Sequence, residues 1–236
     1  MRTQHFNIFN TGTESFFTPG TQLANIARVK PDAPAVIYVS PENKETVMTW
    51  QELHELSNRI AWYLLDPGKS VLAALPNIPT HIALAFGIWK TGACYVPVSN
   101  RAPQRNLMEI CTCVSPALVI TNRKKPDGYP SLSTAELKTL CAGYSAQMPP
   151  DVLAIPNLAN CSGGTTGKTK VIEQDMPAGE SDEGLRTWFS VSGMRFEMRQ
   201  LLAGPLFHGA PHSAAFNGLY CGNTLVMPAK LDAETI

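Results

Sequence analysis

Nine consecutive residues are the most informative about the fold and function of this chain: Ser162-Gly163-Gly164-Thr165-Thr166-Gly167-Lys168-Thr169-Lys170. Their glycines let backbone N–H groups turn toward a ligand with no Cβ in the way. The hydroxyl groups add short hydrogen-bond donors, and Lys168 and Lys170 add positive charge. Backbone dipoles backed by ammonium groups suit phosphate groups. The stretch therefore predicts a polyphosphate-binding loop rather than a mobile polar loop.

Two kinds of nucleotide loop share this composition, and the residues that follow favour one of them. In a Walker A loop, the Gly-Lys-Thr ending opens a helix that completes the phosphate site. Gly167-Lys168-Thr169 fits that ending, but Ser162 stands where the first glycine belongs. The next residues, 171–174, form a β-like run that ends in a Pro/Gly turn. We expect the loop to join two strands, which leaves a P-loop nucleotidase as the minor alternative.

Apolar strands and helices alternate along the first half of the chain. The pattern predicts strands at 35–39, 47–49, 70–75, 93–98 and 117–121, and helices at 50–64, 81–90 and 103–114. We expect the first two strands to form a hairpin, and Thr49 with Glu52 to cap the helix that follows. With the hairpin counted as the first β unit, the order β-α-β-α-β-α-β predicts an α/β fold with mostly parallel sheets flanked by helices.

The second half continues this alternation around the glycine-rich loop. A short helix is expected at 133–140, a strand at 151–160 leading into the loop, and a helix at 180–191. A strand at 201–204, a helix at 211–220 and a strand at 224–227 complete the prediction.

Composition narrows the classes of partner and compartment. Nineteen basic and nineteen acidic residues leave no net charge, so we expect no nucleic-acid partner. The N-terminus lacks the apolar core of a signal peptide, and no apolar run is long enough for a transmembrane segment. Six cysteines without metal-binding spacing indicate reduced thiols, so a cytoplasmic location is expected. A homo-oligomer is left open.

Residues 162–170 resemble the signature [ST]-[SG]-G-[ST]-T-G-x-P-K of the adenylate-forming (AMP-binding) superfamily. That superfamily holds acyl- and aryl-CoA ligases, peptide-synthetase adenylation domains and luciferases. The resemblance departs at Thr169, where the signature has proline, and the substitution removes a fixed φ from the loop. Three further segments are similar to family motifs in the same order: 49–59, 89–98 and 204–208.

This resemblance implies an ATP-dependent ligase of the acyl-CoA branch, with the fold of the N-terminal part of an acyl-CoA synthetase large domain. The phrase Gly204-Pro205-Leu206-Phe207-His208 is most similar to ligases for bulky acids, including the bile-acid and steroid-acid group. Residues 1–236 then correspond to the N-terminal portion of the AMP-binding domain. The C-terminal domain with the catalytic lysine is absent, so we expect this portion alone to be inactive. A non-catalytic nucleotide-binding or regulatory module is the alternative.

The resemblance also assigns roles to residues. ATP and Mg²⁺ are the implied cofactors, and a small carboxylic acid and CoA are the implied substrates. The ATP phosphates are assigned to Ser162, Gly163, Gly164, Thr165, Thr166, Gly167, Lys168 and Lys170, and Mg²⁺ to Thr166. His208 is the candidate catalytic residue, placed to orient the carboxylate by hydrogen bonding.

The other polar candidates receive simpler interpretations. We expect His5, His54, His81 and His212 on surfaces, with a pocket position as the alternative for His212. Lys90 and Arg105 are interpreted as solvated helix charges.

Overall fold

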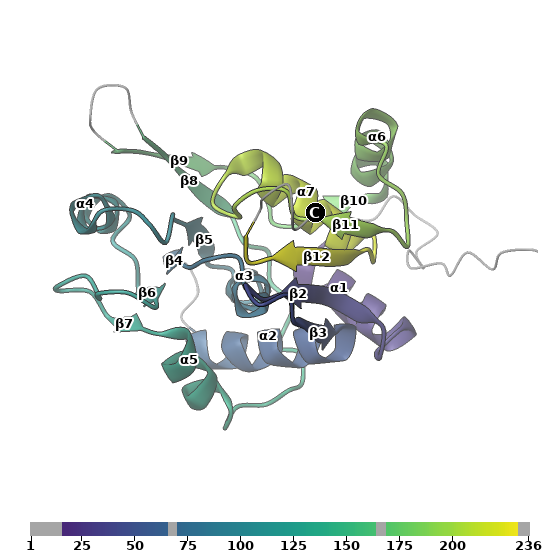
Figure 1. Ribbon diagram of the computed structural model, residues 1–236, viewed down its shortest axis with the longest axis horizontal. Helices are drawn as coiled ribbons and strands as arrows, with labels where there is room; N and C mark the ends of the chain where they lie inside the picture. Colours follow the sequence, from purple (N-terminus) through teal and green to yellow (C-terminus); the bar gives the residue numbers. More distant parts are fainter. Residues whose placement is uncertain (1–15, 66–69, 164–168, 231–236) are drawn as a thin grey trace, which may run out of the picture.

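The computed structural model describes residues 16–65, 70–163 and 169–230. Within these ranges the helices are α1 (Pro19–Val29), α2 (Trp50–Leu64), α3 (Pro79–Trp89), α4 (Gln104–Val114), α5 (Thr134–Cys141), α6 (Asp182–Ser192) and α7 (Gly209–Tyr220). The strands are β1 (Phe16–Phe17), β2 (Pro34–Val39), β3 (Glu45–Thr49), β4 (Ser70–Ala74), β5 (Cys94–Pro97), β6 (Leu118–Thr121), β7 (Ser131–Leu132), β8 (Leu158–Gly163), β9 (Thr169–Gln174), β10 (Glu180–Ser181), β11 (Arg199–Leu201) and β12 (Thr224–Pro228). Figure 1 shows helices on both sides of the strands, which is the α/β class that the sequence predicts.

A six-stranded sheet forms one half of the molecule, with the strand order β7-β6-β4-β5-β8-β9. Every neighbouring pair is parallel except β8 and β9, which form an antiparallel hairpin at one edge. The central strands β4 and β5 are apolar and buried on both faces, as is typical of parallel strands inside a sheet. In β4, Val71 and Ala73 belong to one core, and Leu72 and Ala74 belong to the core on the opposite face.

Helices cover both faces of this sheet. Helix α4 packs Leu107, Ile110 and Cys111 onto the face that carries Leu72. Helix α3 lies on the other face, and its residues from Thr80 to Trp89 are all buried. A helix that is apolar around its whole circumference belongs in the interior, and α3 lies between the two larger sheets in Figure 1.

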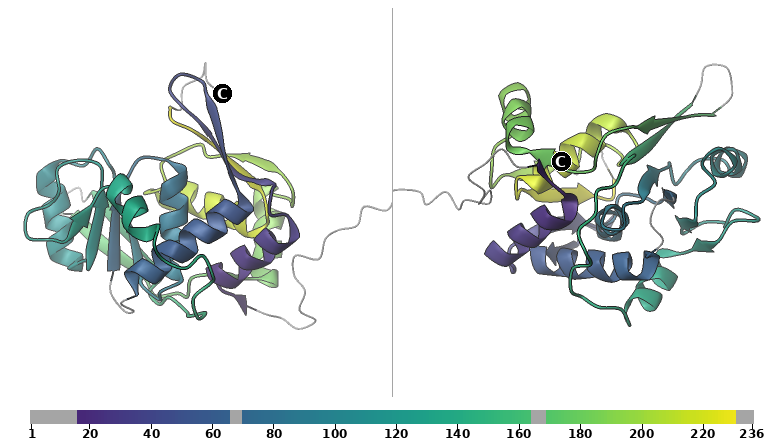
Figure 2. Two further views of the ribbon diagram at one scale, coloured as in Figure 1. Left: turned by 90° about the horizontal axis from the view of Figure 1, so that it is seen from below. Right: turned by 180° about the vertical axis from the view of Figure 1, so that it is seen from behind.

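The second sheet has four strands in the order β11-β12-β2-β3. Strand β2 pairs in parallel with β12, which lies far along the chain, and antiparallel with β3. The β2–β3 hairpin therefore forms as predicted, and it projects from the body in Figure 2, left. The hairpin at the start of the predicted β-α-β series does not share a sheet with β4, β5 and β6, because β2 pairs with β12 in this separate sheet.

Local signals fixed several boundaries well and one poorly. Thr49 and Glu52 form both hydrogen bonds of the predicted capping box at the start of α2. Helix α1 was not predicted, although Thr18 caps its first turn and Pro19 stands at its start. The strand expected at 151–160 begins only at Leu158, and the preceding residues have no regular structure.

Two further observations concern the cysteines and the length of the helices. All six cysteines are free, and all but Cys113 and Cys161 are buried. Across residues 16–65, 70–163 and 169–230, none of the helices combines the length and the apolar character that a bilayer crossing needs.

Candidate functional site

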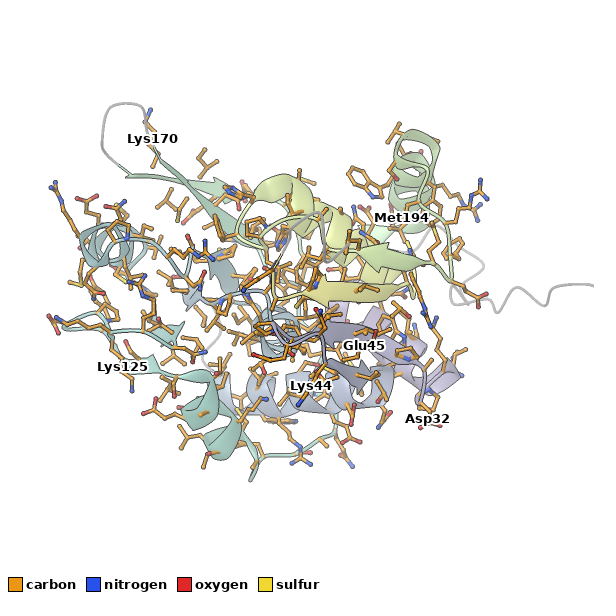
Figure 3. The ribbon with its side chains drawn as sticks, viewed as in Figure 1. Asp32, Lys44, Glu45, Lys125, Lys170 and Met194 are labelled. Atoms are coloured by element: carbon orange, nitrogen blue, oxygen red, sulfur yellow. The ribbon has the colours of Figure 1, made fainter. Side chains whose placement is uncertain are left out.

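The glycine-rich stretch joins the two strands of an antiparallel hairpin. Gly163 stands opposite Thr169, and Ser162 stands opposite Lys170. Strand β9 begins at Thr169, where a Walker A loop requires the start of a helix, so the P-loop nucleotidase alternative is wrong. In Figure 2, right, the hairpin extends away from the body. Lys170 is exposed near its outer end in Figure 3.

The centre of the predicted phosphate loop lies outside the described residues. This holds for Gly164, Thr165, Thr166, Gly167 and Lys168, so their assignment to phosphates, and that of Thr166 to Mg²⁺, stays a prediction. Among the residues that the structure does describe, no group of three His, Cys, Asp or Glu side chains could hold a metal ion.

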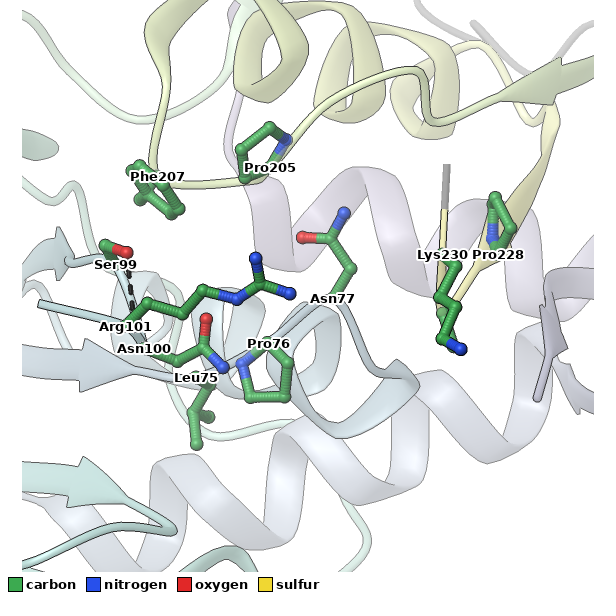
Figure 4. Close-up of a pocket in the computed structure, with 11 residues that line it drawn as sticks. Leu75, Pro76, Asn77, Ser99, Asn100, Arg101, Pro205, Phe207, Pro228 and Lys230 are labelled. Carbon is green, nitrogen blue, oxygen red and sulfur yellow. Dashed lines mark hydrogen bonds between the residues drawn. The ribbon is translucent and has the colours of Figure 1, made fainter. Parts of the chain in front are cut away.

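A cleft of about 500 Å³ lies at the carboxyl ends of strands from the six-stranded and the four-stranded sheet. It is lined by Leu75, Pro76, Asn77, Ser99, Asn100, Arg101, Pro205, Phe207, Pro228, Ala229 and Lys230. The segments after β4, β5 and β12 supply most of these residues, and the turn before α7 supplies the rest (Figure 4). Ligands of open α/β sheets bind outside the carboxyl ends of the strands. Because β8 runs parallel to β5, the carboxyl end of β8, where the glycine-rich stretch begins, points in the same direction as the carboxyl end of β5.

The charge of the cleft is positive. Arg101 and Lys230 are exposed and lie on opposite sides of it (Figure 4), and none of the lining residues that the structure describes is acidic. Two cations on the described lining give this part of the cleft a field that attracts anions. The cleft is therefore suited to a ligand that carries phosphate or carboxylate groups.

His208 stands at the N-terminus of α7, beside the wall of the cleft. It is the N-cap residue of that helix, with an extended backbone and no side-chain capping bond. Its ring lies against the ring of Phe207, with the centroids 4.4 Å apart, and Phe207 lines the cleft. The side chain is exposed, so it is free to bond a ligand that reaches this end of the cleft.

Two other histidines lie in the core, so the prediction that they occupy surfaces is wrong. His81 is 1% exposed and His212 is 6% exposed. Burial lowers the pKa of His81 to about 4 and that of His212 to about 3, so both rings are neutral. Tyr95 contacts both of them: its hydroxyl lies 2.6 Å from Nε2 of His81, and its ring stacks on that of His212. His54 is half-buried, and its pKa falls to about 4, chiefly through burial.

Lys90 is also buried, which contradicts its interpretation as a solvated helix charge. Its side chain ends in the core, where Nζ donates to Ser57 Oγ at 2.7 Å and to Asn58 Oδ1 at 2.6 Å. Burial lowers the pKa of this ammonium group to about 7, and Asp151 opposes the shift. Arg105 is exposed as predicted and pairs with Glu109 one helical turn away.

Asn77 and Lys230 are among the cleft residues that sequence reasoning missed. Each follows the carboxyl end of a strand, β4 for Asn77 and β12 for Lys230. That position is the signal that could have identified them, since the ends of parallel strands gather at one edge. The pattern placed both strands correctly but gave no reason to bring their ends together.

Comparison with known proteins identifies a family and several relatives by sequence, and solved structures with a similar fold. The model of a protein family described as "AMP-binding enzyme" matches residues 23–236. The pyochelin synthetase PchE of Pseudomonas aeruginosa is 29% identical over 210 residues, which cover 86% of this chain and 14% of the synthetase. The 2-succinylbenzoate–CoA ligase of Bacillus pumilus is 27% identical over 228 residues, which cover 91% of this chain and 44% of the ligase. The chain thus spans less than half the length of either relative.

Solved structures share the fold. The N-terminal domain of FACL13 from Mycobacterium tuberculosis superposes with a TM-score of 0.76 at 24% identity, covering 92% of this chain and 58% of that one. The O-succinylbenzoate coenzyme A synthetase MenE from Bacillus subtilis, solved in complex with AMP, superposes with a TM-score of 0.73 at 20% identity, covering 94% of this chain and 58% of that one.

Proposed function

The chain belongs to the AMP-binding enzyme family, and from that premise we propose that its protein activates a carboxylic acid with ATP. In the proposed first step, a carboxylate oxygen attacks the α-phosphorus of ATP. An O–P bond to the acyl group forms, the bond to the β-phosphate bridge breaks, and pyrophosphate leaves. The observations that support this proposal best are the antiparallel strands β8 and β9, which flank the glycine-rich stretch, and the cleft that presents Arg101 and Lys230.

The proposed reaction brings two anions together, so its barrier depends on positive charge and on positioning. Lys170 at the loop, and Arg101 and Lys230 at the cleft, supply exposed cations on the described part of the chain. Ser162, Gly163, Gly164, Thr165, Thr166, Gly167 and Lys168 are proposed to complete the phosphate site with backbone N–H and hydroxyl donors. Mg²⁺ at Thr166 would supply further charge neutralisation.

His208 is proposed to orient the acid. Its exposed ring lies beside Phe207, and a hydrogen bond from imidazole to the carboxylate would hold the attacking oxygen toward the phosphate. We further propose that the thiol of CoA then attacks the acyl carbon of the adenylate, forming the thioester and releasing AMP. The similarity to a CoA ligase supports CoA as the acceptor. The similarity to peptide synthetases makes a carrier-protein thiol the second candidate.

Acid-dependent exchange of labelled pyrophosphate into ATP tests the first step in the complete protein. A panel of aryl, fatty, steroid and amino acids should contain at least one acid that supports exchange. Lys170→Ala should lower that exchange, and Lys44→Ala, at an exposed position of the β2–β3 turn, should leave it unchanged. Exchange with no acid of the panel refutes acid activation and favours the non-catalytic module. Trapping the thioester on CoA or on a carrier protein then identifies the acceptor.

We also propose that residues 1–236 form the N-terminal portion of the adenylation domain and cannot form acyl-adenylate alone. The family match over residues 23–236 supports this proposal, as does a chain that spans less than half the length of the two relatives.

A further inference from the structure

The turn Pro76-Asn77 connects the cleft to the segment that carries Phe207 and His208. Asn77 follows strand β4 and lines the cleft. Its Nδ2 donates to the carbonyl of Gly204 at 3.0 Å, and its Oδ1 accepts from the amide of Leu206 at 3.1 Å. One side-chain amide thus binds the backbone on both sides of Pro205. In Figure 4 the side chain of Asn77 points toward this segment.

Residues 204–206, the segment that Asn77 binds, are packed against helix α7 on the side away from Asn77. A Cβ on Gly204 would lie 2.6 Å from Cγ of Pro211, so the backbone packs directly against helix α7. Leu206 is 1% exposed. The amide of His208 donates to the carbonyl of Pro205 at 3.1 Å, which closes the turn that leads into α7. Fixing residues 204–206 therefore fixes the direction in which Phe207 and His208 leave the turn.

Asn77 is itself held from the core. His81 Nδ1 lies 3.1 Å from the carbonyl of Pro76, and because a carbonyl only accepts, Nδ1 carries the proton. Nε2 of His81 then accepts from the hydroxyl of Tyr95, 2.6 Å away. A chain of hydrogen bonds runs from strand β5 through α3 to the turn after β4. This turn is a rigid support rather than a free loop.

We propose that Asn77 is a positioning residue, which clamps the backbone at Gly204 and Leu206 and so places Phe207 and His208 at the cleft. The catalytic part of this inference rests on the proposed function, in which His208 orients the acid. The clamp itself is a property of the free protein. A side chain with one hydrogen-bonding atom cannot replace it, because one donor must reach the carbonyl of Gly204 while a separate acceptor reaches the amide of Leu206.

The test compares Asn77→Ala with Asn122→Ala in the complete protein. Asn122 is the matched control: its Oδ1 accepts from the amide and hydroxyl of Thr134 at 2.9 and 3.0 Å, and it does not line the cleft. We expect Asn77→Ala to raise hydrogen exchange at the Leu206 amide at least about tenfold and to move the His208 ring signal in NMR spectra toward its value in an unfolded peptide. The adenylation kcat should fall at least about tenfold, with the KM for ATP within about twofold. Asn122→Ala should change none of these.

Hydrogen exchange and the NMR signal test the clamp, and kcat tests the positioning role in the proposed function. If Asn77→Ala folds and neither the Leu206 amide nor the His208 signal changes, the clamp is wrong. If both signals change and kcat does not, the positioning role is wrong. If the wild-type protein activates no acid while both signals respond, the proposed function fails and the clamp stands. Should Asn77→Ala not fold, Asn77→Asp keeps the acceptor for Leu206 but loses the donor to Gly204, and an unchanged His208 signal in that variant overturns the proposal.

Discussion

Replacing Lys90 by methionine should remove a pH dependence from the stability of this protein. Lys90 lies 3% exposed between α2 and α3, and its ammonium group donates to neutral oxygen atoms of Ser57 and Asn58. Burial lowers its pKa from 10.5 to about 7 in the folded state. Methionine has a similar length and no charge, so the variant keeps the packing of the stem.

The direction in which the free energy of unfolding changes with pH follows from proton binding to Lys90. Between pH 7 and 10.5 the unfolded chain keeps the proton on Lys90 and the folded chain releases it, so the free energy of unfolding rises with pH. Each pH unit contributes at most about 1.4 kcal/mol. From pH 7.0 to 8.5, where the folded group goes from half to nearly full deprotonation, the contribution amounts to about 1.5 kcal/mol. Below pH 7 both states bind the proton, and the contribution becomes constant.

Urea unfolding of wild type and Lys90→Met at pH 7.0 and 8.5 measures this difference. The buried thiols, such as Cys94 and Cys221 with pKa values raised to about 12, weaken the folded state as pH rises. Their effect cancels when the variant is subtracted from wild type. Lys138→Met, at an exposed position of α5, should show the wild-type pH dependence. A wild-type-minus-variant difference that stays constant within about 0.5 kcal/mol between the two pH values would refute the reasoning.

Three further expectations can be measured directly. Gly87→Ala should destabilise the protein by about 1–3 kcal/mol in urea unfolding, because the new Cβ would lie 2.6 Å from Cγ2 of Ile60, whereas Gly143→Ala, with no atom within 4 Å, should be close to neutral. Thr49→Ala should cost about 1 kcal/mol in the same assay through loss of the capping box, and a cost below about 0.3 kcal/mol would contradict this. In the complete protein, Lys170→Ala should slow single-turnover adenylation about 30- to 1000-fold and Lys168→Ala less than about fivefold, and equal losses would show that the motif register is wrong.

Local sequence signals determined most of the elements of this protein. The capping pair Thr49 and Glu52 fixed the start of α2, and apolar runs fixed strands β4, β5 and β6, because each of these depends on neighbours within a few residues. The same holds for the glycine-rich stretch: the β-like run after Thr169 sufficed to predict a hairpin rather than a strand–loop–helix unit. The family resemblance rests on such local motifs, and the match over residues 23–236 confirms it.

Contacts between distant segments decided the rest. Strand β2 pairs with β12 across most of the chain, and nothing near β2 in the sequence states which sheet it joins. His81 and Lys90 stand near the two ends of α3, and the sequence predicted that both would be exposed to solvent. Helix α3 lies between sheets, however, and both side chains are buried. Asn77 reaches Gly204 and Leu206 only because β4 and α7 meet at one edge. A sequence pattern records which face of an element is apolar, whereas burial and partnership depend on what the folded chain brings against that face, and that is set only when the whole core packs.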